Sequence, residues 1–128
     1  MRVLLDTHVF LWTLDDSPKL PRGARELMTA PGTECLVSAV SFWEIAIKAG
    51  LRRKDFRVDA AKLIAAAQAA GLTQLPFLAA HAVRVARLPH HHADPFDRAL
   101  IAQALAEPVT LITHDAALAR YGNAVRVV

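Results

Sequence analysis

Residues 89 to 98 read Pro-His-His-His-Ala-Asp-Pro-Phe-Asp-Arg, with two acids three positions apart where a helix is expected to begin. Asp94 followed by Pro95 is typical of an N-cap with proline at the first helical position. Apolar residues then recur at helical spacing from Leu100 to Leu105. Residues three apart share a helix face, so Asp97 is expected one turn inside the helix, on the side of the cap. Capping accounts well for Asp94, and the favourable charge at a helix N-terminus accounts for Asp97 only in part.

Short apolar runs alternate with helical segments along the rest of the chain. Helices are expected after Thr7, from Pro21, after Ser38, after Asp59, over 77–87, after Asp94 and after Asp115. The expected strands are 2–5, 35–37, 72–75 and 109–112, with 125–128 as a candidate fifth. Strands that are apolar on both faces and alternate with helices are typical of a parallel sheet between two helical layers. We therefore expect a single α/β domain over residues 1–128, with a central parallel sheet of four to five strands.

Composition narrows the class of protein. The chain of 128 residues is 54% hydrophobic, which suffices for a proper core, and no apolar run approaches the ~20 residues that a bilayer requires. The N-terminus carries an early acid and no signal-peptide pattern, and Cys35 is the only cysteine, so we expect a cytoplasmic protein without an internal disulfide. The formal charge of +3 gives mild support for a polyanionic partner.

Four acids from distant segments are expected at one edge of this sheet. Asp6 ends the first strand, Glu44 lies within two turns of the end of the second, and Asp115 lies just past the fourth. Asp97 begins the helix that runs back to the fourth strand, so it starts at the same edge. Sites in open parallel sheets form at the carboxyl ends of the strands. The four acids converge if the first and fourth strands are neighbours, which periodicity alone leaves open.

Each acid also has a purely structural interpretation. Asp6 fits an Asx turn, and Asp115 fits an N-cap. Glu44 fits a capping box with Ser41 or an ion pair with Lys48, four residues on. Each structural interpretation is adequate for its own acid. Together they are weaker, because four acids with unrelated structural roles would have to lie at one edge of the sheet by chance.

A cluster of carboxylates requires compensation. Two like charges ~4–5 Å apart repel by a few kcal/mol at an effective dielectric near 20, so such a cluster takes up protons or binds cations. Oxygen ligands suit Mg²⁺ or Mn²⁺, and Mg²⁺ keeps several waters. A site of this kind can activate a metal-bound water against a phosphodiester.

Four segments of the chain together resemble the PIN domain family, specifically the VapC-type toxin ribonucleases of type II toxin–antitoxin pairs. They are Val-Leu-Leu-Asp-Thr-His at 3–8, Val-Ser-Ala-Val-Ser-Phe-Trp-Glu-Ile-Ala-Ile-Lys at 37–48, His-Ala-Asp-Pro-Phe-Asp-Arg-Ala-Leu-Ile-Ala-Gln-Ala at 92–104 and Leu-Ile-Thr-His-Asp at 111–115. The resemblance implies a compact three-layer α/β/α sandwich with its acids grouped at one rim. It also implies cleavage of RNA that depends on Mg²⁺ or Mn²⁺.

Roles for individual acids follow from the resemblance, position by position. Asp6, Glu44 and Asp97 match the three core acids of the family, which serve as catalytic metal ligands. Asp115 matches a fourth acid whose use varies more across the family. Asp94 belongs to the Asp-Pro-Phe-Asp version of the motif, and we assign it the capping role, with a place among the metal ligands as the lesser alternative.

Other roles that the resemblance implies concern hydrogen bonds and partners. Thr7 and Thr113 flank the acids and are expected to support them by hydrogen bonds. The family also implies a homodimer and a cognate VapB-like antitoxin, whose tail lies along the toxin groove and can block the site. Trp12 and Trp43 fall within apolar helical faces, so we expect core or dimer contacts from them rather than base stacking.

Two basic features are open to more than one interpretation. The run Arg52, Arg53, Lys54 and Arg57 is either a solvated connector or a set of phosphate contacts to RNA. The histidines at 90–92 do not predict a zinc site, because three adjacent residues cannot all point at one ion and no partner follows at zinc-finger spacing. A solvated loop, or one histidine near the path of the RNA, is the better interpretation.

Three other functions compete with a metal-dependent ribonuclease. A phosphotransferase of the haloacid-dehalogenase type requires a second aspartate two residues after Asp6, and that position is His8. A PIN-like module that binds RNA or a protein without catalysis is disfavoured by the intact set of acids. A structure-specific DNA nuclease remains an alternative, because the same acids serve both backbones and no residue is seen to read a 2′-hydroxyl.

Overall fold

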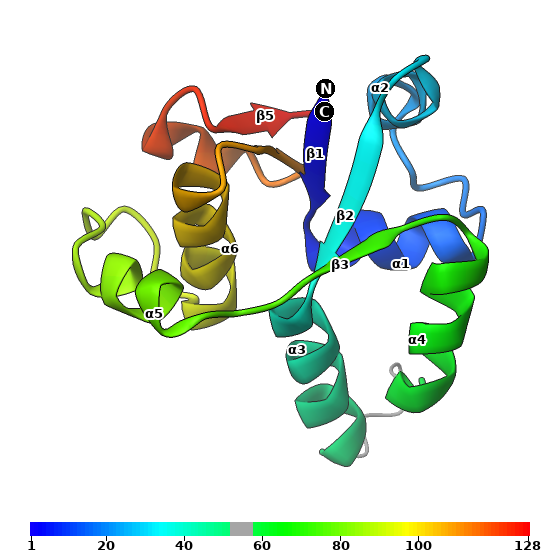
Figure 1. The fold of residues 1–128 in the computed structure, drawn as a ribbon, viewed down its shortest axis with the longest axis horizontal. Coiled ribbons are helices and arrows are strands. Elements are labelled where there is room, and N and C mark those ends of the chain that lie inside the picture. The colour runs from blue at the N-terminus through cyan, green and yellow to red at the C-terminus, as the bar shows by residue number, and fades with distance from the viewer. Residues whose placement is uncertain (52–57) are drawn as a thin grey trace.

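The computed structural model describes residues 1–51 and 58–128, and these residues form one five-stranded parallel sheet with the strand order β3-β2-β1-β4-β5 (Figure 1). The expected α/β fold is confirmed, and so is the candidate fifth strand. The strands are β1 (Arg2–Leu5), β2 (Glu34–Ser38), β3 (Thr73–Leu75), β4 (Thr110–Thr113) and β5 (Val125–Val127).

Helices cover both faces of this sheet, which makes three layers. Figure 1 shows α5 and α6 on one side of the sheet and α1, α2 and α4 on the other, with α3 extending below the end of β2. The helices are α1 (Thr7–Leu14), α2 (Arg22–Thr29), α3 (Ala39–Gly50), α4 (Ala60–Ala69), α5 (Ala79–Ala86) and α6 (Pro95–Ala106), and a 3₁₀ helix, η1, spans Ala116–Tyr121. None of the described helices is both long enough and apolar enough to cross a membrane.

The core is divided by the sheet because successive side chains of a strand point to opposite faces. Leu4 of β1 packs in a cluster with α6, which buries Leu100 and Ile101 completely. Val3 and Leu5 pack in the second cluster, with α1 and the inner face of α3. Burial on both faces explains why the strands read as continuous apolar runs.

The first and fourth strands are neighbours, as convergence of the acids requires. β1 pairs with β2 on one side and with β4 on the other, and the amide of Asp6 extends the pairing with β4 by donating to the carbonyl of Ile112 at 3.0 Å. The chain crosses from β1 to one half of the sheet and later returns to the other half. The β1–β4 boundary is therefore a topological switch point, the place where open α/β sheets form their ligand crevices.

Most of the expected helix caps are confirmed. The side chains of Ser38, Asp59, Asp94 and Asp115 each accept a hydrogen bond from a backbone amide in the first turn of the helix that follows. The expectation that Thr7 caps the first helix is wrong. Asp6 is the N-cap of α1 and has the extended backbone that a cap requires, whereas Thr7 is already the first helical residue.

Trp43 does not belong to the core, contrary to one of the two expected roles. Its side chain is 60% exposed, and its ring packs edge-on against Phe96 with centroids 5.1 Å apart. α3 instead buries the face that carries Val40, Glu44 and Ile45. A helix that is apolar nearly all round does not reveal which face is buried, and here the buried face is the one with the acid.

Candidate metal centre

Asp6 lies at the end of β1 with both carboxylate oxygens engaged. Oδ1 accepts from the amide of Val9 at 2.8 Å, and Oδ2 accepts from the hydroxyl of Thr113, at the end of β4, at 2.5 Å. Burial raises the pKa of Asp6, the bonds from Thr113 and Val9 oppose that rise, and the charge of Glu44 adds to it. Thr113 thus supports Asp6 as expected, and it fixes the carboxylate across the switch point.

Glu44 is a buried acid that is held from two sides. Its Oε1 accepts from the hydroxyl of Thr7 at 2.7 Å, and its Oε2 pairs with Nζ of Lys48 at 2.7 Å. The ion pair with Lys48 therefore exists. The capping box with Ser41 does not, because Ser38 is the cap and Ser41 lies inside the helix, where its hydroxyl oxygen lies 3.0 Å from that of Thr7. A buried carboxylate without such partners would be costly, so these contacts stabilise Glu44 at the rim.

Asp94 and Asp97 have different environments at the start of α6. Asp94 accepts from the amides of Phe96 at 2.8 Å and Asp97 at 3.3 Å, which confirms its capping role. No described hydrogen-bond donor reaches the carboxylate of Asp97. Burial is the largest cause that raises the pKa of Asp97 to about 7. The charges of Asp94, Asp6 and Glu44 add to the rise, in decreasing order of effect.

Burial is the largest cause of the raised pKa of Asp97, and the charges of acids from other elements add to it. Asp6 comes from the end of β1, Glu44 from α3 and Asp97 from α6, and all three lie at the carboxyl edge of the sheet. Like charges in a partly buried space favour the protonated form of the weakest-held carboxylate. Asp97 is that carboxylate, because it lacks the hydrogen bonds that Asp6 and Glu44 receive.

His92 joins the site although we did not predict a role for this particular residue. Its Nε2 lies 3.4 Å from Oδ2 of Asp115, and its Nδ1 lies 3.8 Å from Oδ2 of Asp97. Among the described residues, His92, Asp97 and Asp115 form a group whose potential ligand atoms all lie within 4.8 Å of one another. Asp6 and Glu44 are not in that tighter group. The one sequence signal was the position of His92, two residues before the cap of the helix that carries Asp97.

The donor set fits a hard divalent cation. The acids offer oxygen ligands, as Mg²⁺ and Mn²⁺ prefer, and a cation would relieve the repulsion that adds to the effect of burial on the pKa of Asp97. Asp97 and Asp115 have the more accessible carboxylates, with side chains 24% and 45% exposed. Asp6 and Glu44 are the more deeply held. Mg²⁺ usually keeps several waters, so these two acids can contribute through water as well as directly.

Two further features named from the sequence are His91 and the basic run. His91 packs against Tyr121 with ring centroids 5.1 Å apart. The basic run Arg52, Arg53, Lys54 and Arg57 falls outside the described residues.

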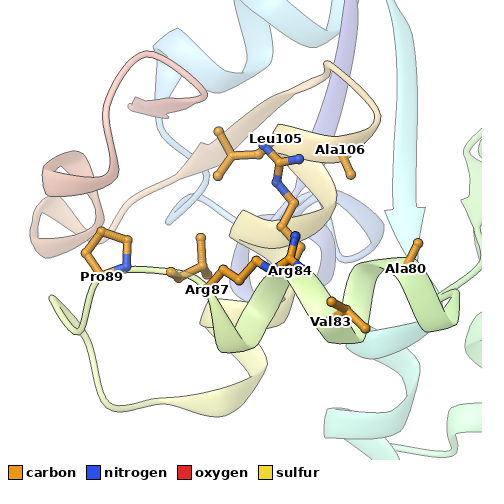
Figure 2. Close-up of a pocket in the computed structure, with 8 residues that line it drawn as sticks. Ala80, Val83, Arg84, Arg87, Pro89, Leu105 and Ala106 are labelled. Atoms are coloured by element: carbon orange, nitrogen blue, oxygen red, sulfur yellow. The ribbon is translucent and has the colours of Figure 1, made fainter.

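A separate groove lies between α5 and the C-terminal part of α6 (Figure 2). Its volume is about 510 Å³, and its lining combines apolar residues with two arginines, Arg84 and Arg87. None of the acids of the metal centre lines it. The groove is therefore a different surface from the rim at the switch point.

The fold and the rim define a small parallel α/β domain with carboxylates clustered at its switch point. The family model of the PIN domain matches residues 3–124, so the chain belongs to the PIN domain family. No curated protein matches the sequence.

Several solved structures share the whole fold. VapBC2 from Rickettsia felis, bound to a DNA fragment from its promoter, aligns with a TM-score of 0.70 at 16% identity, over 99% of this chain and 97% of that one. VapBC-5 from Mycobacterium tuberculosis aligns with a TM-score of 0.61 at 23% identity, over 99% and 97%. A toxin–antitoxin complex from Klebsiella pneumoniae gives 0.66 at 17% identity, over 98% and 96%. In fold, the chain thus resembles components of toxin–antitoxin complexes.

Proposed function

We propose that the protein is a Mg²⁺- or Mn²⁺-dependent endoribonuclease and the toxin of a toxin–antitoxin pair. The observation that carries the proposal is the grouping of Asp6, Glu44 and Asp97 at the carboxyl edge of the sheet, where burial first, and then the charges of Asp94, Asp6 and Glu44, raise the pKa of Asp97 to about 7. Membership of the PIN family, whose members are typically nucleases that use divalent metals, supports the same assignment. The similar structures support the toxin role, since they are complexes of toxins with antitoxins.

The side chains divide into ligands and supports under this proposal. Asp6, Glu44, Asp97 and Asp115 would hold the ion, and Asp94 orders the first turn of α6. When bound, the ion would supply a water of lowered pKa and stabilise charge on the phosphodiester. Thr113 keeps Asp6 in place by its hydroxyl bond. A cation at this rim would also favour the approach of phosphates that the acids alone would repel.

The proposed partners follow from the same comparison. A VapB-like antitoxin would bind along the rim and cover the acids, and the toxin would act as a homodimer in the cytoplasm. RNA is the proposed substrate, and the basic run Arg52, Arg53, Lys54 and Arg57 is the proposed phosphate-contacting segment.

Purified protein is expected to cut total RNA with Mg²⁺ or Mn²⁺ and to stop when EDTA is added. Mapping the new ends by sequencing gives the cleavage sites. Asp6→Asn and Asp97→Asn are expected to lower the cleavage rate at least ~100-fold, because several kcal/mol of charge stabilisation depend on the ion. The same two variants are expected to remove growth inhibition. Asp15→Asn is the matched control, since Asp15 is exposed at the other end of α1.

Specific outcomes would contradict the proposal. A fully active, toxic Asp97→Asn protein would remove Asp97 from the site. Binding of RNA without any cleavage in Mn²⁺ would favour the non-catalytic module. Cleavage of structured DNA with RNA left intact would favour the DNA nuclease.

A further inference from the structure

The loop between α5 and α6 is anchored by a buried arginine. Arg98 donates from Nη1 to the carbonyl of Pro89 at 2.9 Å and from Nη2 to the carbonyl of Val85 at 3.0 Å. Nη1 also lies 3.2 Å from the hydroxyl of Tyr121, which itself donates to the carbonyl of Pro89 at 3.0 Å. Burying a guanidinium is costly unless its donors are satisfied. Here the guanidinium donates to backbone carbonyls in the last part of α5 and at the start of the loop. These bonds fix the conformation of the chain where the loop begins.

The loop's conformation determines which nitrogen of His92 carries the proton. The amide of Asp94 donates to Nδ1 of His92 at 3.2 Å, so Nδ1 is an acceptor. A neutral imidazole with an accepting Nδ1 carries its proton on Nε2. Nε2 lies 3.4 Å from Oδ2 of Asp115, a polar contact longer than a hydrogen bond. In this arrangement neither nitrogen has a lone pair free for a metal, so His92 is placed to act on a carboxylate.

Asp115 is held by the backbone through one carboxylate oxygen and lies beside His92 with the other. Its side chain is 45% exposed, and its Oδ1 is occupied as the cap of η1 by the amide of Ala117 at 3.0 Å. Its Oδ2 lies beside His92, in the same group as the carboxylate of Asp97. Repulsion between two carboxylates would turn an unrestrained one toward solvent. The imidazole N–H offsets that repulsion on the side where Asp115 faces Asp97.

We propose that His92 is a positioning residue that holds Asp115 toward Asp97 and so sets the affinity of the site for Mn²⁺ or Mg²⁺. The inference rests on the metal centre of the proposed function and extends it to a residue outside the acids. Arg98 and Tyr121 act indirectly, because they hold the start of the loop that carries His92.

Binding of Mn²⁺ to the purified full-length chain tests the inference. The free Mn²⁺ signal in electron paramagnetic resonance gives the Kd without any RNA. His92→Ala is expected to raise the Kd about tenfold, the lower end of the effect of removing groups that orient metal ligands. His90→Ala is the neighbouring control and is expected to leave the Kd unchanged.

Two amide substitutions separate positioning from mere folding. His92→Gln places an N–H near the position of Nε2 and is expected to bind Mn²⁺ nearly as the parent does. His92→Asn keeps an acceptor near Nδ1 but loses the N–H toward Asp115, so it is expected to bind as weakly as His92→Ala. In the Asp115→Asn background, His92→Ala is expected to cause no further loss. Thermal unfolding in EDTA shows whether each variant is folded.

The outcomes distinguish this inference from the nuclease proposal. An unchanged Kd in His92→Ala, or equal losses in His92→Gln and His92→Ala, would overturn the role of His92 and leave the ribonuclease standing. An additional loss in the Asp115→Asn background would likewise overturn it. Parent protein that binds Mn²⁺ with the expected pattern but cuts no nucleic acid would overturn the ribonuclease and support the positioning role.

Discussion

Asp97→Asn is expected to make the metal-free protein more stable while it removes RNA cleavage. Raising the pKa of a carboxyl from 3.8 to about 7 corresponds to about 4 kcal/mol of stability lost above pH 7, at 1.36 kcal/mol per pKa unit. Asparagine removes the charge but leaves a partly buried amide without an assigned partner. We therefore expect about half of that gain, roughly 2 kcal/mol, and a Tm about 7 °C higher for a chain of this size.

The pH dependence of this gain has a definite sign. Asp97 binds a proton more tightly in the folded protein than in the unfolded chain, so its contribution to stability is present below pH 4 and lost as pH rises through 7. The difference between Asp97→Asn and the parent should therefore be largest at pH 8 and shrink toward pH 4. Differential scanning calorimetry in EDTA measures both curves.

Asp15→Asn supplies the control for the stability measurement, because it removes an exposed charge at the C-terminal end of α1. Its Tm is expected to stay within about 2 °C of the parent, as for most exposed substitutions. A lower Tm for metal-free Asp97→Asn at pH 8 would contradict the electrostatic account of the rim. It would mean that the Asp97 carboxylate stabilises the fold rather than straining it.

Mn²⁺ is expected to bind about tenfold more weakly at pH 6 than at pH 8. Protons and the metal compete for Asp97, whose pKa is about 7, so at pH 6 about nine-tenths of the metal-free protein carries the competing proton. The pKa of Asp6 is also raised, which makes tenfold a lower bound. Binding at pH 7 should release protons, seen in calorimetry as an apparent enthalpy that changes with the ionisation enthalpy of the buffer.

The same binding measurements define the result that would contradict this prediction. Equal affinity at pH 6 and pH 8, with no proton release at pH 7, would show that the ion is bound by groups already ionised throughout. Asp97 would then not be among its ligands. The Asp97→Asn protein provides the reference, since any residual Mn²⁺ binding should lack the proton release that Asp97 contributes.

The layers of the fold were predictable because the strands are apolar on both faces and alternate with capped helices. Asp94, followed by Pro95, carries its own capping signal, and the structure confirms it. The adjacency of β1 and β4 was not predictable in the same way. It depends on pairing between segments about a hundred residues apart, and it is this pairing that brings Thr113 to Asp6.

The errors also have physical causes. Asp6 and Thr7 are both capable caps, and the sequence does not show that the hydroxyl of Thr7 has a partner on α3 in Glu44. The sequence alone does not distinguish the roles of His90, His91 and His92, because they are three adjacent residues of the same type. Only the loop conformation fixed by Arg98 directs His92, and not its neighbours, toward the acids.

Diffraction from crystals of the protein grown with Mn²⁺ tests the central claim most directly, because the anomalous signal of manganese locates the ion. The account predicts a peak at the β1–β4 switch point, within direct coordination distance of a carboxylate oxygen of Asp97, with Asp6 as a ligand directly or through one water. Saturating Mn²⁺ that leaves this place without a peak, or a peak coordinated only by residues elsewhere, would contradict it.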